Sequence, residues 1–250
     1  MRTAKSWSRA LNMLPLLLFA IAWEAAGRLA NTPLLPPLSK VLNALEQMLL
    51  QGILLKNLAF SLVRVILGFL AGSIVGLSLG IFMGWNELAY RFLSPLFSIL
   101  YPIPTLGWMP LLMLWLGLNE TLPVTIIFLC TFIPVLYNTI TGIRSVDRQY
   151  ITTARTLGAS PLLVLWKVVI PMALPQIFTG LRLEAGMAWR TVAVAEMIAI
   201  PTGIGALLIK AESLIRVDII MACLLVIACI SLGCERIFWW LENKLTAGWR

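Results

Sequence analysis

The sequence contains no histidine and few charged residues of any kind. Only 12% of its 250 residues are Asp, Glu, Lys or Arg, which is roughly half the share found in an ordinary soluble domain. The missing histidine removes the commonest general base and metal ligand. Because hydrophobic residues make up 60% of the chain, too few polar side chains remain to cover a soluble globule, and lipid must contact much of the surface.

Motifs for nucleotide binding and covalent catalysis are also missing from the sequence. No GxxxxGK[ST] segment occurs, so the chain has no P-loop for ATP, and no GxSxG nucleophile elbow appears. The four cysteines lie in apolar runs without a CxxC pair, so we interpret them as small lipid- or core-facing residues. We therefore expect no catalytic residue, cofactor site or metal site in this chain. The net charge of +8 is typical of basic cytoplasmic loops, and we expect no nucleic acid partner.

Six stretches are apolar and long enough to cross a bilayer as helices, which takes about 20 residues. They cover residues 11–30, 57–84, 92–117, 122–142, 172–199 and 217–241. None alternates as a transmembrane strand would. The predicted fold class is therefore an all-α integral membrane protein, with a cytoplasmic N-terminus at 1–10 and a single membrane domain at 11–250. We expect the first span to remain as an uncleaved anchor.

Lysine and arginine are distributed unequally between the segments that flank these spans. With the N-terminus inside, most of them fall on cytoplasmic segments, and the outer ones are Lys40, Lys56, Lys210 and Arg216. This bias predicts that both termini lie in the cytoplasm. Between the first two spans, residues 38–50 have apolar residues at helical spacing, which predicts an amphipathic helix on the outer membrane face.

The second span combines a glycine repeat with one arginine. The glycines recur every four residues, so they share one helix stripe and allow a neighbouring helix to approach closely. They are Gly72, Gly76, Gly80 and Gly84. We interpret Arg64, near the start of this span, as an interfacial anchor.

The third span contains prolines, each of which removes a backbone donor and opposes regular helix. They are Pro102, Pro104 and Pro110. Two interpretations remain open: a broken helix that lies beside a translocation path, or a kink that only shapes packing.

The longest cytoplasmic connection, residues 143–171, has the signals of two short helices. Asp147 can cap a helix over 148–157, which Gly158 can end. Ser160 can cap a second helix that has Pro161 at its first position, runs through 162–170 and stops at Pro171. Both helices are too short to cross the membrane. We call this pair of short helices with its glycine turn the elbow. It could transfer force from a soluble partner, and the alternative is a structured loop that rests on lipid headgroups.

The fifth span contains ionisable residues. Placing one such side chain in lipid near the bilayer centre costs at least ~2.5 kcal/mol, so it normally faces protein or water. Arg182, Trp189 and Glu196 are evenly spaced along one helix stripe, and Glu184 and Arg190 lie in the same apolar run. Either these residues line the path of a solute and set its polarity, or they pair internally and orient helices.

The connection 143–171 resembles the cytoplasmic EAA motif of ABC importer permeases. The similar residues are Thr152-Thr153-Ala154, Gly158 and Val168-Val169-Ile170-Pro171, with Thr152 in place of the usual Glu and Thr153 in place of the usual Ala. In that family the elbow is the coupling helix, which sits in a groove of an ATPase subunit. The resemblance implies a coupling set of Thr152, Thr153, Ala154, Leu157, Gly158, Ala159, Ser160 and Pro171.

Further blocks in the same order resemble the nitrate/sulfonate/taurine branch of this family. They include Ser61-Leu62-Val63-Arg64, Tyr101-Pro102-Ile103-Pro104 and Gly180-Leu181-Arg182. The resemblance implies the type I importer permease fold in a bacterial inner membrane. It also implies a second permease copy as a homodimer, two ATPase subunits that hold ATP and Mg, and an extracytoplasmic binding protein.

The implied cargo is a small anion such as nitrate, a sulfonate or taurine, and the alternative is a vitamin precursor or another small organic solute. A stand-alone secondary transporter would predict inverted repeats and ion-coupling carboxylates, and no convincing repeat relates the two halves. An intramembrane enzyme would need a positioned nucleophile, which the sequence lacks.

Overall fold

The computed structural model describes residues 2–246, with side chains from residue 14 to 245, and this part of the chain contains helices and no strand. The predicted all-α class is therefore confirmed. The helices are α1 (Arg2–Ala30), α2 (Leu38–Leu50), α3 (Ile53–Trp85), α4 (Glu87–Leu100), α5 (Met109–Leu116), α6 (Thr121–Arg144), α7 (Arg148–Thr156), α8 (Pro161–Val164), α9 (Ile170–Ala199), α10 (Ile204–Ser213) and α11 (Val217–Thr246).

The membrane-spanning elements follow the apolar stretches of the sequence. Among the described residues, four continuous helical segments are long and apolar enough to cross a bilayer: Ile53–Trp85, Thr121–Arg144, Pro161–Ala199 and Val217–Leu245. Helix α4 and the segment Thr105–Leu116 form a fifth candidate, bent by 81°. Pro102 and Pro104 of the third predicted span lie at this bend, between Leu100 and Thr105. The first predicted span coincides with the C-terminal part of α1, although the side chains of residues 1–13 lie outside the described part.

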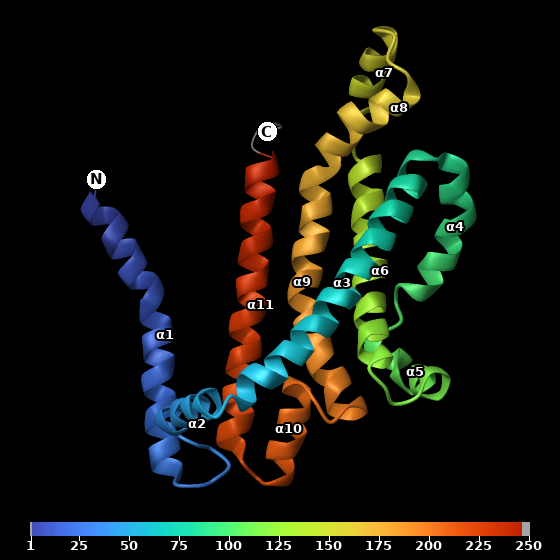
Figure 1. The fold of residues 1–250 in the computed structure, drawn as a ribbon. Coiled ribbons are helices and arrows are strands. Elements are labelled where there is room, and N and C mark those ends of the chain that lie inside the picture. Colours follow the sequence, from blue (N-terminus) through green and yellow to red (C-terminus); the bar gives the residue numbers. More distant parts are fainter. Residues whose placement is uncertain (1, 247–250) are drawn as a thin grey trace.

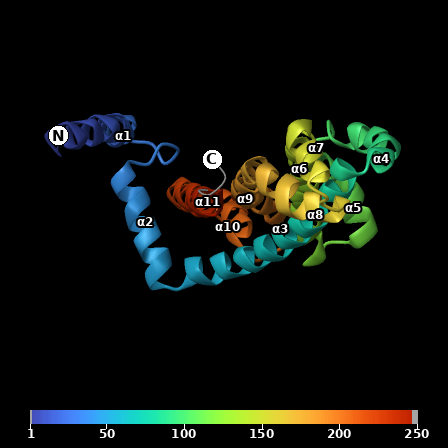
Figure 2. The same cartoon turned by 90° about the horizontal axis from the view of Figure 1, so that it is seen from above.

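The helices are arranged so that the elbow and both chain ends lie at one end of the bundle. Figure 1 shows the start of α1, the end of α11 and the helices α7 and α8 at the top, while α2, α5 and α10 lie at the bottom. We call the first the elbow end and the second the far end. Helix α3 crosses the bundle obliquely, and α1 stands apart from α9 and α11 in both views (Figure 2).

Helix α3 packs against α6 along the predicted glycine stripe. A Cβ atom added to any of five glycines of α3 would lie only 2.6–2.9 Å from an atom of α6, so no side chain fits between the two helices. They are Gly68, Gly72, Gly76, Gly80 and Gly84. The stripe therefore extends one position further toward the far end than the sequence analysis placed it, at Gly68, which has the same four-residue spacing.

The second helix of the elbow does not stop at Pro171, and that part of the prediction is wrong. Helix α8 continues through a π-helical turn at Leu165–Val169 into α9, which gives a helical rod of 39 residues over Pro161–Ala199. Proline is tolerated here because Pro171 lies in the first turn of α9, directly after the π turn, where the α-helical hydrogen-bond pattern is already interrupted.

Candidate functional site: the elbow and the charged residues of helix α9

The elbow is built by the capping residues that the sequence indicated. The carboxylate of Asp147 accepts a hydrogen bond from the backbone N–H of Gln149 at 2.9 Å, and the hydroxyl of Ser160 accepts one from the N–H of Leu163 at 3.4 Å. Between them Gly158 has a φ of +84°, which glycine adopts without steric cost. The two short helices and their glycine turn are therefore present as predicted.

The elbow has a buried inner side and an exposed apolar outer side. On the inner side Val164 and Val169 are fully buried and pack with Ile143 at the end of α6. On the outer side Leu157 is 84% exposed and Leu162 is 67% exposed. Apolar groups that protrude beyond the end of a membrane helix are typical of a contact with another protein or with lipid.

The residues of the predicted coupling set lie together on this elbow. Thr152, Thr153, Leu157, Gly158 and Ser160 are exposed. Ala154, Ala159 and Pro171 are partly buried. The hydroxyls of Thr152 and Thr153 donate to backbone carbonyls one turn earlier in α7, at 2.9 and 2.8 Å. These two threonines therefore satisfy their hydroxyl donors inside the helix, and Thr152 presents no charge at the position where the resembling motif has Glu.

At the far end, Glu196 of α9 is part of a buried ion pair. Its carboxylate accepts a hydrogen bond from Nη1 of Arg64 at 2.6 Å, from the hydroxyl of Ser61 at 2.8 Å and from the backbone N–H of Gly205 at 3.0 Å. Arg64 is only 2% exposed, so its interpretation as an interfacial anchor is wrong. Pairing with a carboxylate inside the protein offsets the cost of removing the guanidinium from water.

Arg64 also connects loops that the sequence did not link. Its Nε donates to Glu120 at 2.7 Å, in the loop before α6, and its Nη2 donates to the hydroxyl of Thr202 at 2.7 Å, in the loop after α9. A Cβ atom at Gly203 would overlap the carboxylate of Glu196, so this loop closes over the pair only because glycine occupies that position. One arginine therefore joins α3, α9 and two loops at the far end.

The arginines of α9 pair with helix α11. Nη1 of Arg182 lies 3.2 Å from the carboxylate of Glu242, and Nη2 of Arg190 lies 3.7 Å from that of Glu235. Internal pairing, one of the two interpretations left open by the sequence, thus describes both contacts. Arg190 nevertheless keeps 60% of its side chain exposed, which requires water or another protein chain beside it at membrane depth.

The remaining predicted path residues fall into a buried and an exposed group. Trp189 is buried and its indole N–H donates to Cys234 at 3.3 Å. Glu184 is buried against Cys130, whose sulfur lies 3.7 Å from its carboxylate, and it forms no ion pair with any described residue. Pro102 and Pro104 are exposed at the break between α4 and α5. The structure thus leaves these two prolines and Arg190 on the surface of the single subunit.

Comparison with known proteins agrees with this architecture. Residues 68–246 match the family described as binding-protein-dependent transport system inner membrane component. The taurine transport system permease protein TauC of Escherichia coli is 35% identical over 235 residues, which cover 92% of this chain and 86% of TauC. The bicarbonate transport system permease protein CmpB of Synechococcus elongatus is 33% identical over 256 residues, 96% of this chain and 92% of CmpB.

Solved structures show the same fold. The crystal structure of an amino acid ABC transporter with histidines contains a chain that superposes with a TM-score of 0.63 at 19% sequence identity, covering 81% of this chain and 97% of that one. The family works with a separate ATPase and a substrate-binding protein, and the chain itself is not an enzyme. This multi-pass inner-membrane chain belongs to the family of binding-protein-dependent transport system inner membrane components, the permease subunits of ABC importers.

Proposed function

We propose that this permease imports a small anionic or zwitterionic solute and that its elbow, residues 143–171, receives the movement of the ATPase. The observation that carries the proposal is the unbroken rod Pro161–Ala199. Its first turns form the exposed elbow, and its remainder carries the ionisable residues of the membrane core. A displacement of the elbow would therefore move Glu184, Arg190 and Glu196 together, as rigid-body gating requires.

The solute class is inferred from the relatives and from the charge of the exposed path residues. TauC and CmpB are described as permeases for taurine and for bicarbonate, and both solutes carry an anionic group. Of the path residues proposed from the sequence, Arg190 is the one that is both charged and largely exposed. A cation in a low-dielectric path attracts an anion and disfavours a cation.

The same proposal includes a complete transporter around this chain. Two copies of the permease form a homodimer, two ATPase subunits hold ATP and Mg at the elbow end, and the binding protein delivers the solute at the far end. Both termini are then cytoplasmic, because they share the elbow end of the bundle (Figure 1). The basic residues at that end, which include Arg144, Arg148, Arg155 and Lys167, agree with this orientation.

The elbow is tested by Gly158→Arg in the transporter reconstituted with its ATPase and binding protein. At a φ of +84° a side chain strains the turn, and a bulky cation would stand where the ATPase groove closes. We expect loss of the ATP-driven uptake of radiolabelled taurine or of a radiolabelled sulfonate. Insertion of the variant into the membrane should remain normal.

Gly52→Arg is the matched control for this substitution. Gly52 has a φ of +70° and, like Gly158, has no atom within 4 Å of an added Cβ, but it lies in the turn between α2 and α3. Both variants therefore suffer the same kind of strain, and only one of them alters the elbow. Full uptake by Gly158→Arg, or equal loss in both variants, would contradict coupling at this turn.

A further inference from the structure

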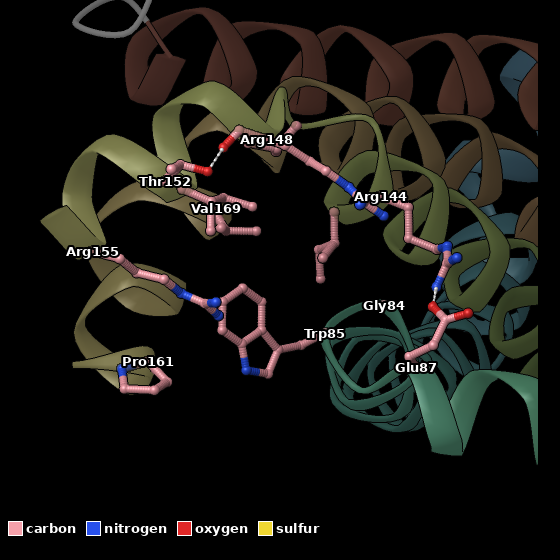
Figure 3. Close-up of a pocket in the computed structure, with 12 residues that line it drawn as sticks. Gly84, Trp85, Glu87, Arg144, Arg148, Thr152, Arg155, Pro161 and Val169 are labelled. Atoms are coloured by element: carbon pink, nitrogen blue, oxygen red, sulfur yellow. Dashed lines mark hydrogen bonds and ion pairs between the residues drawn. The ribbon is translucent and has the colours of Figure 1, made fainter. Parts of the chain in front are cut away.

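A polar cleft lies between the elbow and the ends of the membrane helices, and the exposed Leu157 and Leu162 are not among its lining residues. It has a volume of about 520 Å³ and lies between the end of α3, the start of α4, the end of α6 and the elbow. Figure 3 shows Arg155 directed from α7 toward Trp85 on the opposite wall, whereas Arg148 runs along the wall of the cleft toward Arg144. Thr152 of the coupling set lines this cleft, whereas Arg148 and Arg155 belong neither to the coupling set nor to the solute path proposed from the sequence.

The cleft carries an excess of positive charge. Three arginines line it, and the carboxylate among its lining residues, Glu87, is already bound by Arg144 at 2.8 Å and by Arg91 at 3.0 Å. Arg148 and Arg155 form no ion pair with any side chain in the described range 14–245. Two guanidinium groups are therefore free to bind an anion, and the planar guanidinium geometry suits phosphate oxygens.

The ends of the membrane spans indicate that the cleft lies near the lipid headgroups. Trp85 is the last residue of α3 and Arg144 is the last residue of α6, so two apolar spans end in its walls. The guanidinium of Arg144 lies 3.9 Å from the centroid of the Tyr90 ring. Tryptophan, tyrosine and arginine at the ends of membrane spans are typical of the boundary between acyl chains and headgroups.

An apolar surface on the same α3–α4 turn completes this arrangement. A separate hollow of about 390 Å³ is lined there by Phe82, Leu88, Phe92 and neighbouring residues. Leu88 and Phe92 are 78% and 80% exposed, as expected for residues that contact acyl chains. Exposed apolar residues therefore flank a basic cleft at the end of the spans.

We infer that this cleft binds the phosphate headgroup of an anionic phospholipid from the inner leaflet, held by Arg148 and Arg155. Basic pockets between membrane helices on the cytoplasmic side are suited to such headgroups. A lipid is favoured over an acidic segment of the ATPase because two apolar spans end in the walls of the cleft and the exposed apolar residues Leu88 and Phe92 lie on the adjoining turn. Lipid bound here would support the elbow from behind, next to the end of α3.

The test uses the purified permease–ATPase complex and two lipids, phosphatidylglycerol and the zwitterionic phosphatidylcholine. Native mass spectrometry counts the lipids that the complex retains as phosphatidylglycerol is titrated. The variant is Arg148→Gln with Arg155→Gln, and the control is Arg236→Gln with Lys244→Gln, which removes the same charge from the elbow end of α11, outside the cleft.

Loss of even one charge-assisted hydrogen bond would weaken retention about tenfold. We expect at least this loss for phosphatidylglycerol in the cleft variant relative to the control, and no change for phosphatidylcholine. The single substitution Arg155→Gln should give an intermediate loss and serves if the double variant is poorly folded.

Three results would overturn the inference. The first is equal retention of phosphatidylglycerol by the cleft variant and the control. The second is displacement of the lipid by inorganic phosphate at millimolar concentration, which would assign the cleft to a soluble anion. The third is loss of the ATPase from the cleft variant with its lipid retained, which would assign the arginines to the protein partner. Because the readout is lipid retention, a failure here is distinct from a failure of coupling at Gly158.

Discussion

The two ends of the bundle use arginine in opposite ways. At the far end Arg64 is 2% exposed and is held by Glu196, Glu120 and Thr202. At the elbow end Arg148 and Arg155 are exposed and form no ion pair with any part of the chain that the structure describes. The far end is thus closed by contacts within one subunit, whereas the elbow end keeps its charges and apolar groups available for partners.

The difference between the two ends is tested most directly by removing Glu196, the buried carboxylate partner of Arg64. Glu196→Ala leaves Arg64 in the interior with the exposed Glu120 as its remaining carboxylate partner, and removal of one member of a buried ion pair costs about 3–5 kcal/mol. We expect a large drop in the midpoint of thermal unfolding, measured in detergent by fluorescence-detected gel filtration. The matched elbow variant Arg148→Ala should change stability by no more than about 0.5 kcal/mol. Similar midpoints for the two variants would mean that the far end is no more closed than the elbow end.

A substitution in the glycine stripe, which lies between the two ends, should lower the stability by a smaller amount. A Cβ at Gly76 would lie 2.9 Å from the carbonyl oxygen of Phe132, so Gly76→Leu forces α3 away from α6 at an expected cost of about 1–3 kcal/mol. Gly233→Leu in α11 is the control, because nothing lies within 4 Å of an added Cβ there. We expect the unfolding midpoint of the first variant to fall and that of the second to stay. A normal midpoint for Gly76→Leu would show that the α3–α6 contact is looser than the structure indicates.

The smallest effect is expected at the caps of the elbow. Asp147→Ala removes the acceptor for the N–H of Gln149, and loss of such a cap costs about 1 kcal/mol. The cost should stay local to α7 because that helix has no buried residue of its own. Hydrogen exchange should become faster across Arg148–Thr156 and remain unchanged around Glu196. Asp147→Asn, which keeps a capping oxygen, should restore slow exchange. Faster exchange at both ends would mean that the elbow and the far end unfold as one unit.

Much of the fold follows from composition and local signals. The ends of α3, α6, α9 and α11 lie within a few residues of the predicted spans, because the length of an apolar run is set by the bilayer. The elbow was predictable for a different reason: its capping residues Asp147 and Ser160 and its turn residue Gly158 act on neighbours in the sequence.

The pairing at the far end was not predictable in the same way. Arg64 and Glu196 are 132 positions apart, and no local spacing links them. Glu120, which lies in a loop, also showed no pattern that marked it as a partner of Arg64. Likewise Pro171 carried a local stop signal that the π turn before it overrides. Gly68, by contrast, was missed although its four-residue spacing to Gly72 was visible.

The π turn at Leu165–Val169 has a consequence for how the elbow is aimed. A π turn accommodates one residue more than an α turn in the same stretch of helix, and one residue corresponds to about 100° of rotation about the helix axis. The direction of the elbow therefore depends on where in the sequence this extra residue is accommodated. If the π turn moved or closed, Leu162 would face a different side of the molecule while α9 kept all its contacts in the membrane. A short irregularity at the membrane boundary thus sets the side toward which the elbow points, while the helix on either side of it remains continuous.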